Sequence, residues 1–102
     1  NKAIEKYIHL LHFSQEVVNH SSELYYLSQL GIAHFMNRNF KESLFYFIKV
    51  KEKVIEFDLS TREAFADYNI ADAYLQLHEL ENALKHFKIA LDVSDYTYFM
   101  AH

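Results

Sequence analysis

At 102 residues, with 51% hydrophobic and 17% aromatic content, the chain can bury a core and is not a disordered segment. Its net charge of −4 disfavours nucleic acid as a partner, and no apolar run approaches the roughly 20 residues that span a bilayer. Proline and cysteine are absent and Gly31 is the one glycine, which predicts helices with short turns, excludes disulfides and thiolate metal sites, and is typical of a cytoplasmic protein.

Apolar residues recur at helical spacing along the whole chain, and clusters of turn-forming residues separate the apolar segments. We predict helices at about 2–18, 22–37, 41–57, 62–77 and 81–93, with a further helix that begins near 96. Asn39 with Glu42, and Ser60 with Glu63, have capping-box spacing, which supports helix starts near 40 and 61. Strand-type alternation is absent, so the predicted fold class is all-α.

The helices repeat at an interval of forty residues. The stretches KAIEKY (2–7), ESLFYF (42–47) and NALKHF (82–87) align, and each has a small residue four positions before an aromatic one. Two helices per forty residues are typical of a helical-hairpin solenoid, in which each hairpin buries its apolar face against its neighbours. Because a close helix crossing requires a small side chain, we expect Ala3, Ser43 and Ala83 to lie where the second helix of each hairpin crosses the first.

Two segments of the chain resemble the tetratricopeptide repeat. The matching residues are Leu30, Gly31, Phe40, Ser43, Phe47 and Val50 in one copy, and Ala71, Tyr74, Leu80, Ala83, Phe87, Ala90 and Leu91 in the next. The chain departs from the family pattern in its longer unit and at Asp67, where a large apolar residue is usual. In unit length and in its wealth of Tyr, Phe and His it resembles the repeats of Rap-type response-regulator aspartate phosphatases and related peptide-sensing regulators of Firmicutes.

This resemblance implies a right-handed superhelical solenoid over residues 1–102. Residues 1–20 would form the second helix of an incomplete repeat, 22–58 and 62–93 two repeats, and 96–102 the start of another. We expect a segment of a longer solenoid, or a chain that pairs with a second copy to cover its ends.

The resemblance also implies that the first helix of each hairpin lines a concave groove that binds a short peptide or a partner protein. The groove positions, spaced by three and four, are Tyr25, Ser28, Gln29, Ile32, Phe35 and Met36, followed by Phe65, Tyr68, Asn69, Asp72, Leu75 and Gln76. Amides can bond a peptide backbone while rings hold its side chains. Asn69 is the strongest single candidate, and Asp72 could hold a basic group; alternatively, both are solvated and the rings belong to the core.

The histidines suggest a metal site as an alternative. Glu5, His9, His12 and Glu16 form one helical stripe that could offer ligands to zinc, but such stripes on outward faces are usually solvated. No nucleophile motif, phosphate-binding loop or carboxylate pair is visible. We therefore expect no metal, no cofactor and no catalysis by this chain alone, and we expect the lysines at 49, 51 and 53 to form a solvated surface.

Three functions remain open. The first is the peptide-sensing part of a bacterial signalling protein, as in quorum sensing. The second is a segment of a response-regulator phosphatase, which would contact the response regulator through a catalytic bundle outside these residues. The third is a structural scaffold.

Overall fold

The computed structural model describes residues 1–16, 20–59 and 63–101, and for residues 16, 63 and 93–101 it describes the backbone alone. The described residues form five helices and no strands, which confirms the all-α fold class. The helices are α1 (Lys2–Glu16), α2 (His20–Met36), α3 (Phe40–Glu56), α4 (Glu63–Gln76) and α5 (Leu80–Ala101).

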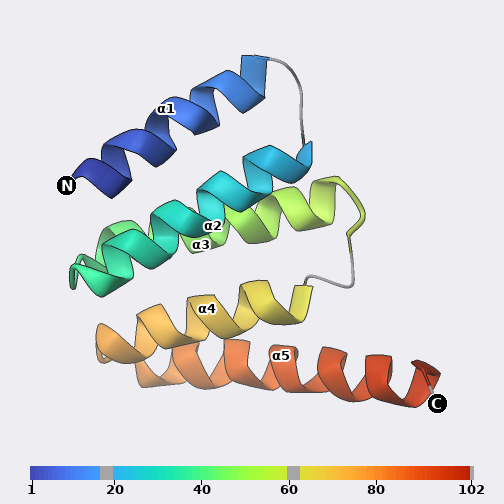
Figure 1. Cartoon of the computed structure of the whole chain (residues 1–102). Helices are drawn as coiled ribbons and strands as arrows, with labels where there is room; N and C mark the ends of the chain where they lie inside the picture. The colour runs from blue at the N-terminus through green and yellow to red at the C-terminus, as the bar shows by residue number, and fades with distance from the viewer. Residues whose placement is uncertain (17–19, 60–62, 102) are drawn as a thin grey trace.

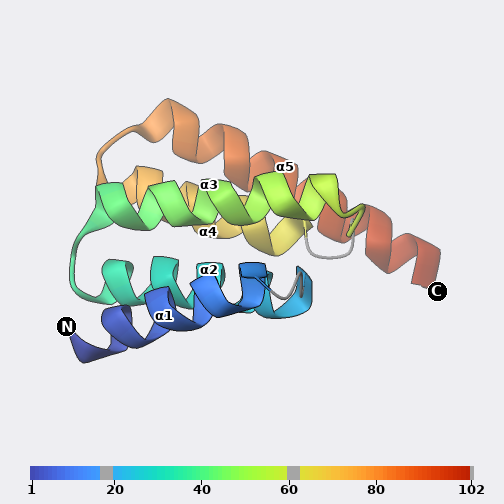
Figure 2. The ribbon, with the colours of Figure 1, turned by 90° about the horizontal axis from the view of Figure 1, so that it is seen from above.

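The five helices follow one another in a row, with α1 at one end and α5 at the other (Figure 1). Each helix packs mainly against its neighbours in the sequence, as α1 with α2, α2 with α3, α3 with α4 and α4 with α5. Seen from above, α3 lies to one side of α1 and α2 (Figure 2). The molecule is accordingly flat, with extents of 38 × 32 × 19 Å.

Two clusters of buried apolar residues join the first four helices. The first centres on Leu11, Leu27 and Leu30 and joins α1, α2 and α3. The second centres on Phe47, Ile70 and Ala73 and joins α3 to α4. Since these residues recur at three- and four-residue spacing, each helix presents an apolar stripe to its neighbours.

The α2–α3 crossing is close because both helices have small groups there. The Ser43 hydroxyl is buried and donates a hydrogen bond of 2.8 Å to the carbonyl oxygen of Gly31. The Phe47 ring packs against Gly31 so tightly that a methyl group at that position would overlap it. Ala83 is also buried, on the α5 helix that packs against α4.

Ala3 is exposed, and the crossing expected for it is not tested, because the repeat mapping makes α1 a second helix whose first helix is not among residues 1–102. Helix α1 packs against the leucine cluster through Ile4, Tyr7 and Ile8. Ala3 lies outside that apolar face, and the burial shared by Ser43 and Ala83 does not extend to it.

Three helices end in the same way. Arg38, Asp58 and His78 have left-handed backbones, with φ of 62°, 55° and 61°. In each case the next N–H donates to a carbonyl five residues earlier, at 2.8 Å for Asn39 to His34 and 2.9 Å for Glu79 to Tyr74. This is the Schellman arrangement, which usually places glycine at the left-handed position.

The structure corrects two local predictions. Helix α5 continues to Ala101, whereas the sequence predicts a turn at 92–95 and a new helix near 96. The polar residues there lower helix propensity by at most about 0.7 kcal/mol each, which is less than a proline would cost. Asn39 does precede α3, but its side chain forms no capping bond. The other capping box, at Ser60, lies outside the described residues.

Candidate functional site

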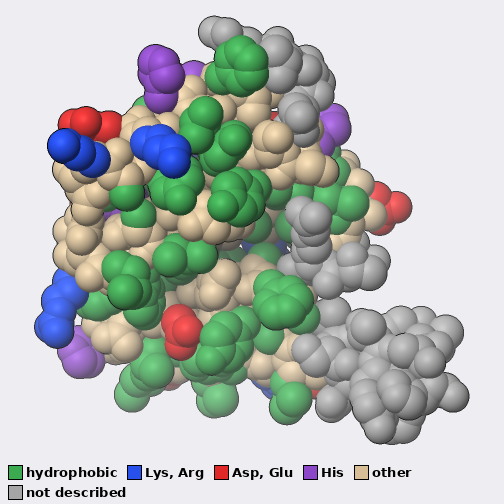
Figure 3. Space-filling model, viewed as in Figure 1, with side chains coloured by type: hydrophobic (Ala, Val, Ile, Leu, Met, Phe, Trp, Pro, Cys, Tyr) green, Lys and Arg blue, Asp and Glu red, His purple; other side chains and the backbone are tan. Residues whose placement is uncertain are grey.

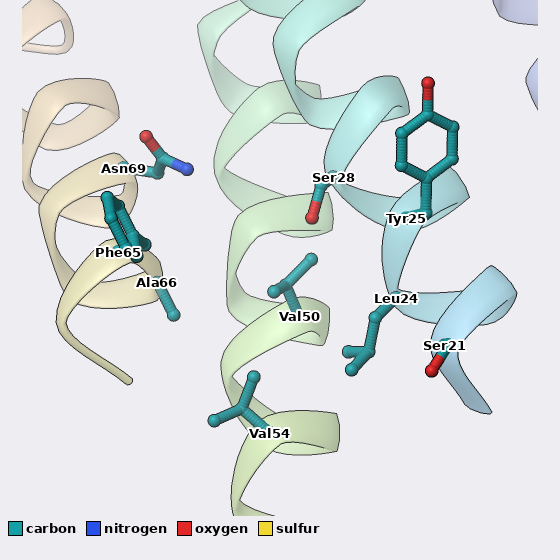
Figure 4. Close-up of a pocket in the computed structure, with 9 residues that line it drawn as sticks. All are labelled: Ser21, Leu24, Tyr25, Ser28, Val50, Val54, Phe65, Ala66 and Asn69. Atoms are coloured by element: carbon teal, nitrogen blue, oxygen red, sulfur yellow. The ribbon is translucent and has the colours of Figure 1, made fainter. Parts of the chain in front are cut away.

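A groove opens between α2 and α4, with α3 between them as its floor (Figure 4). Its volume is about 500 Å³, within the range of roughly 300–1,000 Å³ that is usual for ligand sites. In the space-filling view, hydrophobic side chains gather around the hollow (Figure 3). The lining residues of this α2–α4 groove are Ser21, Leu24, Tyr25 and Ser28 from α2, Val50 and Val54 from α3, and Phe65, Ala66 and Asn69 from α4.

Helical spacing explains why each of the three helices lines the groove with a single face. On α2 the lining residues follow steps of three or four positions, and on α3 and α4 the pairs Val50 with Val54 and Phe65 with Asn69 are four positions apart. Residues three or four positions apart share one face of a helix, so the lining residues of each helix lie on one face of that helix.

The base of the groove is apolar. Leu24, Val54 and Ala66 are at most 3% exposed, and Val50 beside them is half-buried. At the rim, Tyr25 and Phe65 are 54% and 74% exposed, one on each side. A ligand that entered the groove would therefore pass two exposed rings before it reached an aliphatic floor.

Two polar side chains face each other across the groove. The Ser28 hydroxyl projects from α2 and the Asn69 carboxamide from α4, both toward the space above Val50 (Figure 4). Neither side chain hydrogen-bonds to any other residue that the structure describes, so their donors and acceptors are available to a ligand.

Four of the predicted groove residues meet here, namely Tyr25, Ser28, Phe65 and Asn69. Two others contact aromatic rings of neighbouring helices, although Tyr68 remains 52% exposed. Phe35 packs against Phe40, with ring centroids 5.1 Å apart, and Tyr68 packs against Phe87 of α5 at 5.6 Å. The remaining predicted positions do not line the groove: Gln29 and Asp72 are half-buried, while Ile32, Met36, Leu75 and Gln76 are exposed. Burial raises the pKa of the Asp72 carboxyl.

The floor of the groove was missed from the sequence. Val50 and Val54 lie on α3, which the repeat mapping assigns as a second helix, whereas that mapping places groove residues on first helices only. Their spacing of four, which continues the step of three from Phe47 to Val50, was a signal that this face is apolar.

A buried carboxylate lies directly behind one wall. Asp67 follows Ala66 in α4 and is 0% exposed. Its Oδ1 atom is 2.7 Å from Nζ of Lys51 on α3 and 2.7 Å from Nδ1 of His86 on α5. Its Oδ2 atom has no hydrogen-bond partner among the described residues. Asp67 thereby links three successive helices.

A second carboxylate lies behind the opposite wall. Glu23 precedes Leu24 in α2, is 7% exposed, and lies 3.6 Å from Nζ of Lys53 and 3.4 Å from Nε2 of Gln15. A hydrogen bond to Glu56, supported by the charge of Glu23, raises the pKa of the Lys53 amine. The prediction of a solvated lysine surface is therefore wrong for Lys51 and Lys53, which tie α3 to both walls.

The other sites considered are weaker. A second hollow of about 490 Å³ between α1 and α3 contains none of the predicted groove residues. Within the residues that were searched, no three histidine or acidic side chains gather as metal ligands, and the Glu16 side chain lies outside the described part. His9 and His12 are exposed.

No family model, curated protein or solved structure matches the chain. Among the described helices, none has the length and apolar character needed to cross a membrane.

Proposed function

We propose that the chain is a module of stacked helical hairpins that binds an extended peptide, or an extended segment of a partner protein, in the α2–α4 groove. The observation that carries the proposal is the meeting of Tyr25, Ser28, Phe65 and Asn69 in one groove. These residues were selected from the repeat pattern, and they come from two helices separated in the sequence by α3.

The packing order supports the hairpin arrangement within this proposal. Each helix contacts mainly its sequence neighbours, and Ser43 and Ala83 occupy buried positions forty residues apart. Stacking of this kind leaves the first helices α2 and α4 side by side with a groove between them. The resemblance to tetratricopeptide repeats of the Rap type further suggests a regulatory role in a cytoplasmic bacterial signalling protein.

The chemistry of the groove suits a peptide backbone. A carboxamide donates through its nitrogen and accepts through its oxygen, so Asn69 can pair with both groups of one peptide unit. Ser28 on the facing wall can bond the next unit, and the rings of Tyr25 and Phe65 flank the ligand.

The proposal predicts that Asn69→Ala weakens peptide binding. Pools of synthetic hexapeptides are screened against the protein, and the strongest binder is titrated by calorimetry. Loss of two hydrogen bonds of about 1 kcal/mol each should raise Kd roughly tenfold or more.

Gln76→Ala is the matched control, because Gln76 is an exposed amide on the same helix and does not line the groove. It should leave Kd unchanged. Equal weakening by the two substitutions would contradict binding through Asn69 in the groove, and no binding by any pool would favour the structural scaffold.

A further inference from the structure

We infer that the α2–α4 groove selects its peptide by one large, uncharged apolar side chain, which inserts between the two walls onto Val50 and Val54. The inference rests on the proposed function and adds the class of ligand. It begins from the lining of the groove, in which all nine residues that the structure describes are uncharged.

Two carboxylates that lie behind the walls of the groove are already paired. Glu23 lies against Lys53, and Asp67 accepts from Lys51 and His86. Both carboxylates are more than 90% buried behind the walls. A charged ligand side chain at the base would therefore find no free counter-ion among the lining residues, and it would lose its hydration without compensation.

The positions of the polar and apolar groups fix how a peptide can lie. Ser28 and Asn69 project from opposite walls, while the valines of α3 lie deeper between them (Figure 4). In an extended peptide, successive side chains point to opposite faces of the backbone. A backbone bonded to Ser28 and Asn69 would therefore direct one side chain down onto the valines and the next outward to solvent.

The size of the groove favours a large side chain over a small one. A methyl group would leave much of the 500 Å³ unfilled, whereas leucine or norleucine would contact the valines and the ring of Phe65. Burial of three additional carbons should tighten binding by at least about tenfold.

The test uses the whole 102-residue chain and four peptides of the form acetyl-Ala-Ala-X-Ala-Ala-amide, in which X is leucine, norleucine, alanine or lysine. Norleucine and lysine have side chains of similar length and differ mainly in the terminal ammonium. Kd is measured from the chemical shifts of the amides of Ser28, Val50 and Asn69. The leucine and norleucine peptides should bind at least about tenfold more tightly than the alanine peptide, and the lysine peptide no more tightly than it.

Ser28→Leu provides an internal check, because a leucine at this half-buried position would fill the groove. It should abolish the preference for leucine over alanine. Gln29→Leu, which adds the same side chain to α2 outside the groove, should keep that preference.

The possible failures are distinguishable. If all four peptides bind equally and Asn69→Ala weakens them all, the groove binds peptide backbone and only the inferred apolar selection is overturned. If the lysine peptide binds as tightly as the norleucine peptide, the inferred apolar selection is likewise overturned. If no peptide shifts these amides at millimolar concentration, both the inference and the proposed function are contradicted.

Discussion

Asp67 stands at a position where the resemblance to tetratricopeptide repeats leads us to expect a large apolar residue, and its surroundings explain why a carboxylate is found there. The carboxylate lies between α3, α4 and α5 and accepts from one side chain on each outer helix. A buried charge is tolerated only when partners compensate for its lost hydration. The partners lie 16 and 19 residues away, so the sequence pattern alone could not identify them.

Removal of one partner should cost more than removal of the pair. We expect Lys51→Met to lower the free energy of unfolding by roughly 2–4 kcal/mol, because it leaves Asp67 buried with His86 alone. The double variant with Asp67→Leu should recover most of that loss, since a buried ion pair can be replaced by apolar residues at little cost. Urea unfolding measures both values. A double variant less stable than Lys51→Met would contradict this account of Asp67.

The stability of the folded protein should depend on pH through Asp72, and the sign of this dependence can be predicted. Burial raises the pKa of its carboxyl, so the folded state binds the proton more tightly than the unfolded state. The ionised carboxyl therefore costs stability above the raised pKa, and the cost disappears as the pH falls and the group becomes protonated.

Asp72→Asn should accordingly be more stable than the natural chain at about pH 7, by less than about 1 kcal/mol. The difference should shrink toward zero at about pH 3, where both states of the natural chain are largely protonated. Urea unfolding of the two chains at several pH values gives the comparison. A stability gain that grows on acidification would have the wrong sign.

At the scale of the helices, the predicted and observed ends agree where local chemistry determines them. Helices α2, α3 and α4 end within one residue of the predictions at 37, 57 and 77, because turn-forming residues follow each of them. The break predicted at 92–95 is absent, since serine and aspartate discourage a helix weakly and no glycine or proline follows.

The left-handed helix ends offer a simple stabilising change. His78 is exposed with φ of 61°, a conformation that costs a residue with a Cβ atom about 1–2 kcal/mol. His78→Gly should relieve this cost, at an entropic penalty of about 0.5–1 kcal/mol. The net gain of about 0.5–1 kcal/mol should raise Tm by a few degrees in a thermal melt followed by circular dichroism.

His78→Ala is the control, because alanine retains the Cβ atom and the strain. It should give no increase in Tm. An equal increase for alanine and glycine would show that the histidine side chain, and not the backbone, was responsible.

At the scale of the whole molecule, sequence reasoning captured the walls of the groove better than its floor. The spacing on α2 and α4 placed Tyr25, Ser28, Phe65 and Asn69 on two facing surfaces, because helical periodicity is a local property. It could not show that Phe35 and Tyr68 contact rings of neighbouring helices, or that α3 contributes Val50 and Val54. Both depend on how the helices pack together.

The two buried carboxylates, Glu23 and Asp67, connect the helices behind the groove. Lys53 connects α3 to the α2 wall through Glu23, and Lys51 connects α3 to the α4 wall through Asp67. Polar contacts behind the walls therefore join α2 and α4 to the helix that forms the floor. None of these contacts involves a residue that lines the groove.

The central claim is that the α2–α4 groove is where a peptide binds. The most direct measurement is a residue-by-residue NMR map of the labelled chain during titration with the strongest hexapeptide. We expect the largest shift changes on the facing surfaces of α2 and α4 and on α3 near Val50, with little change on α1. Changes concentrated on α1 or on the outer face of α5, with the groove residues unaffected, would contradict the claim.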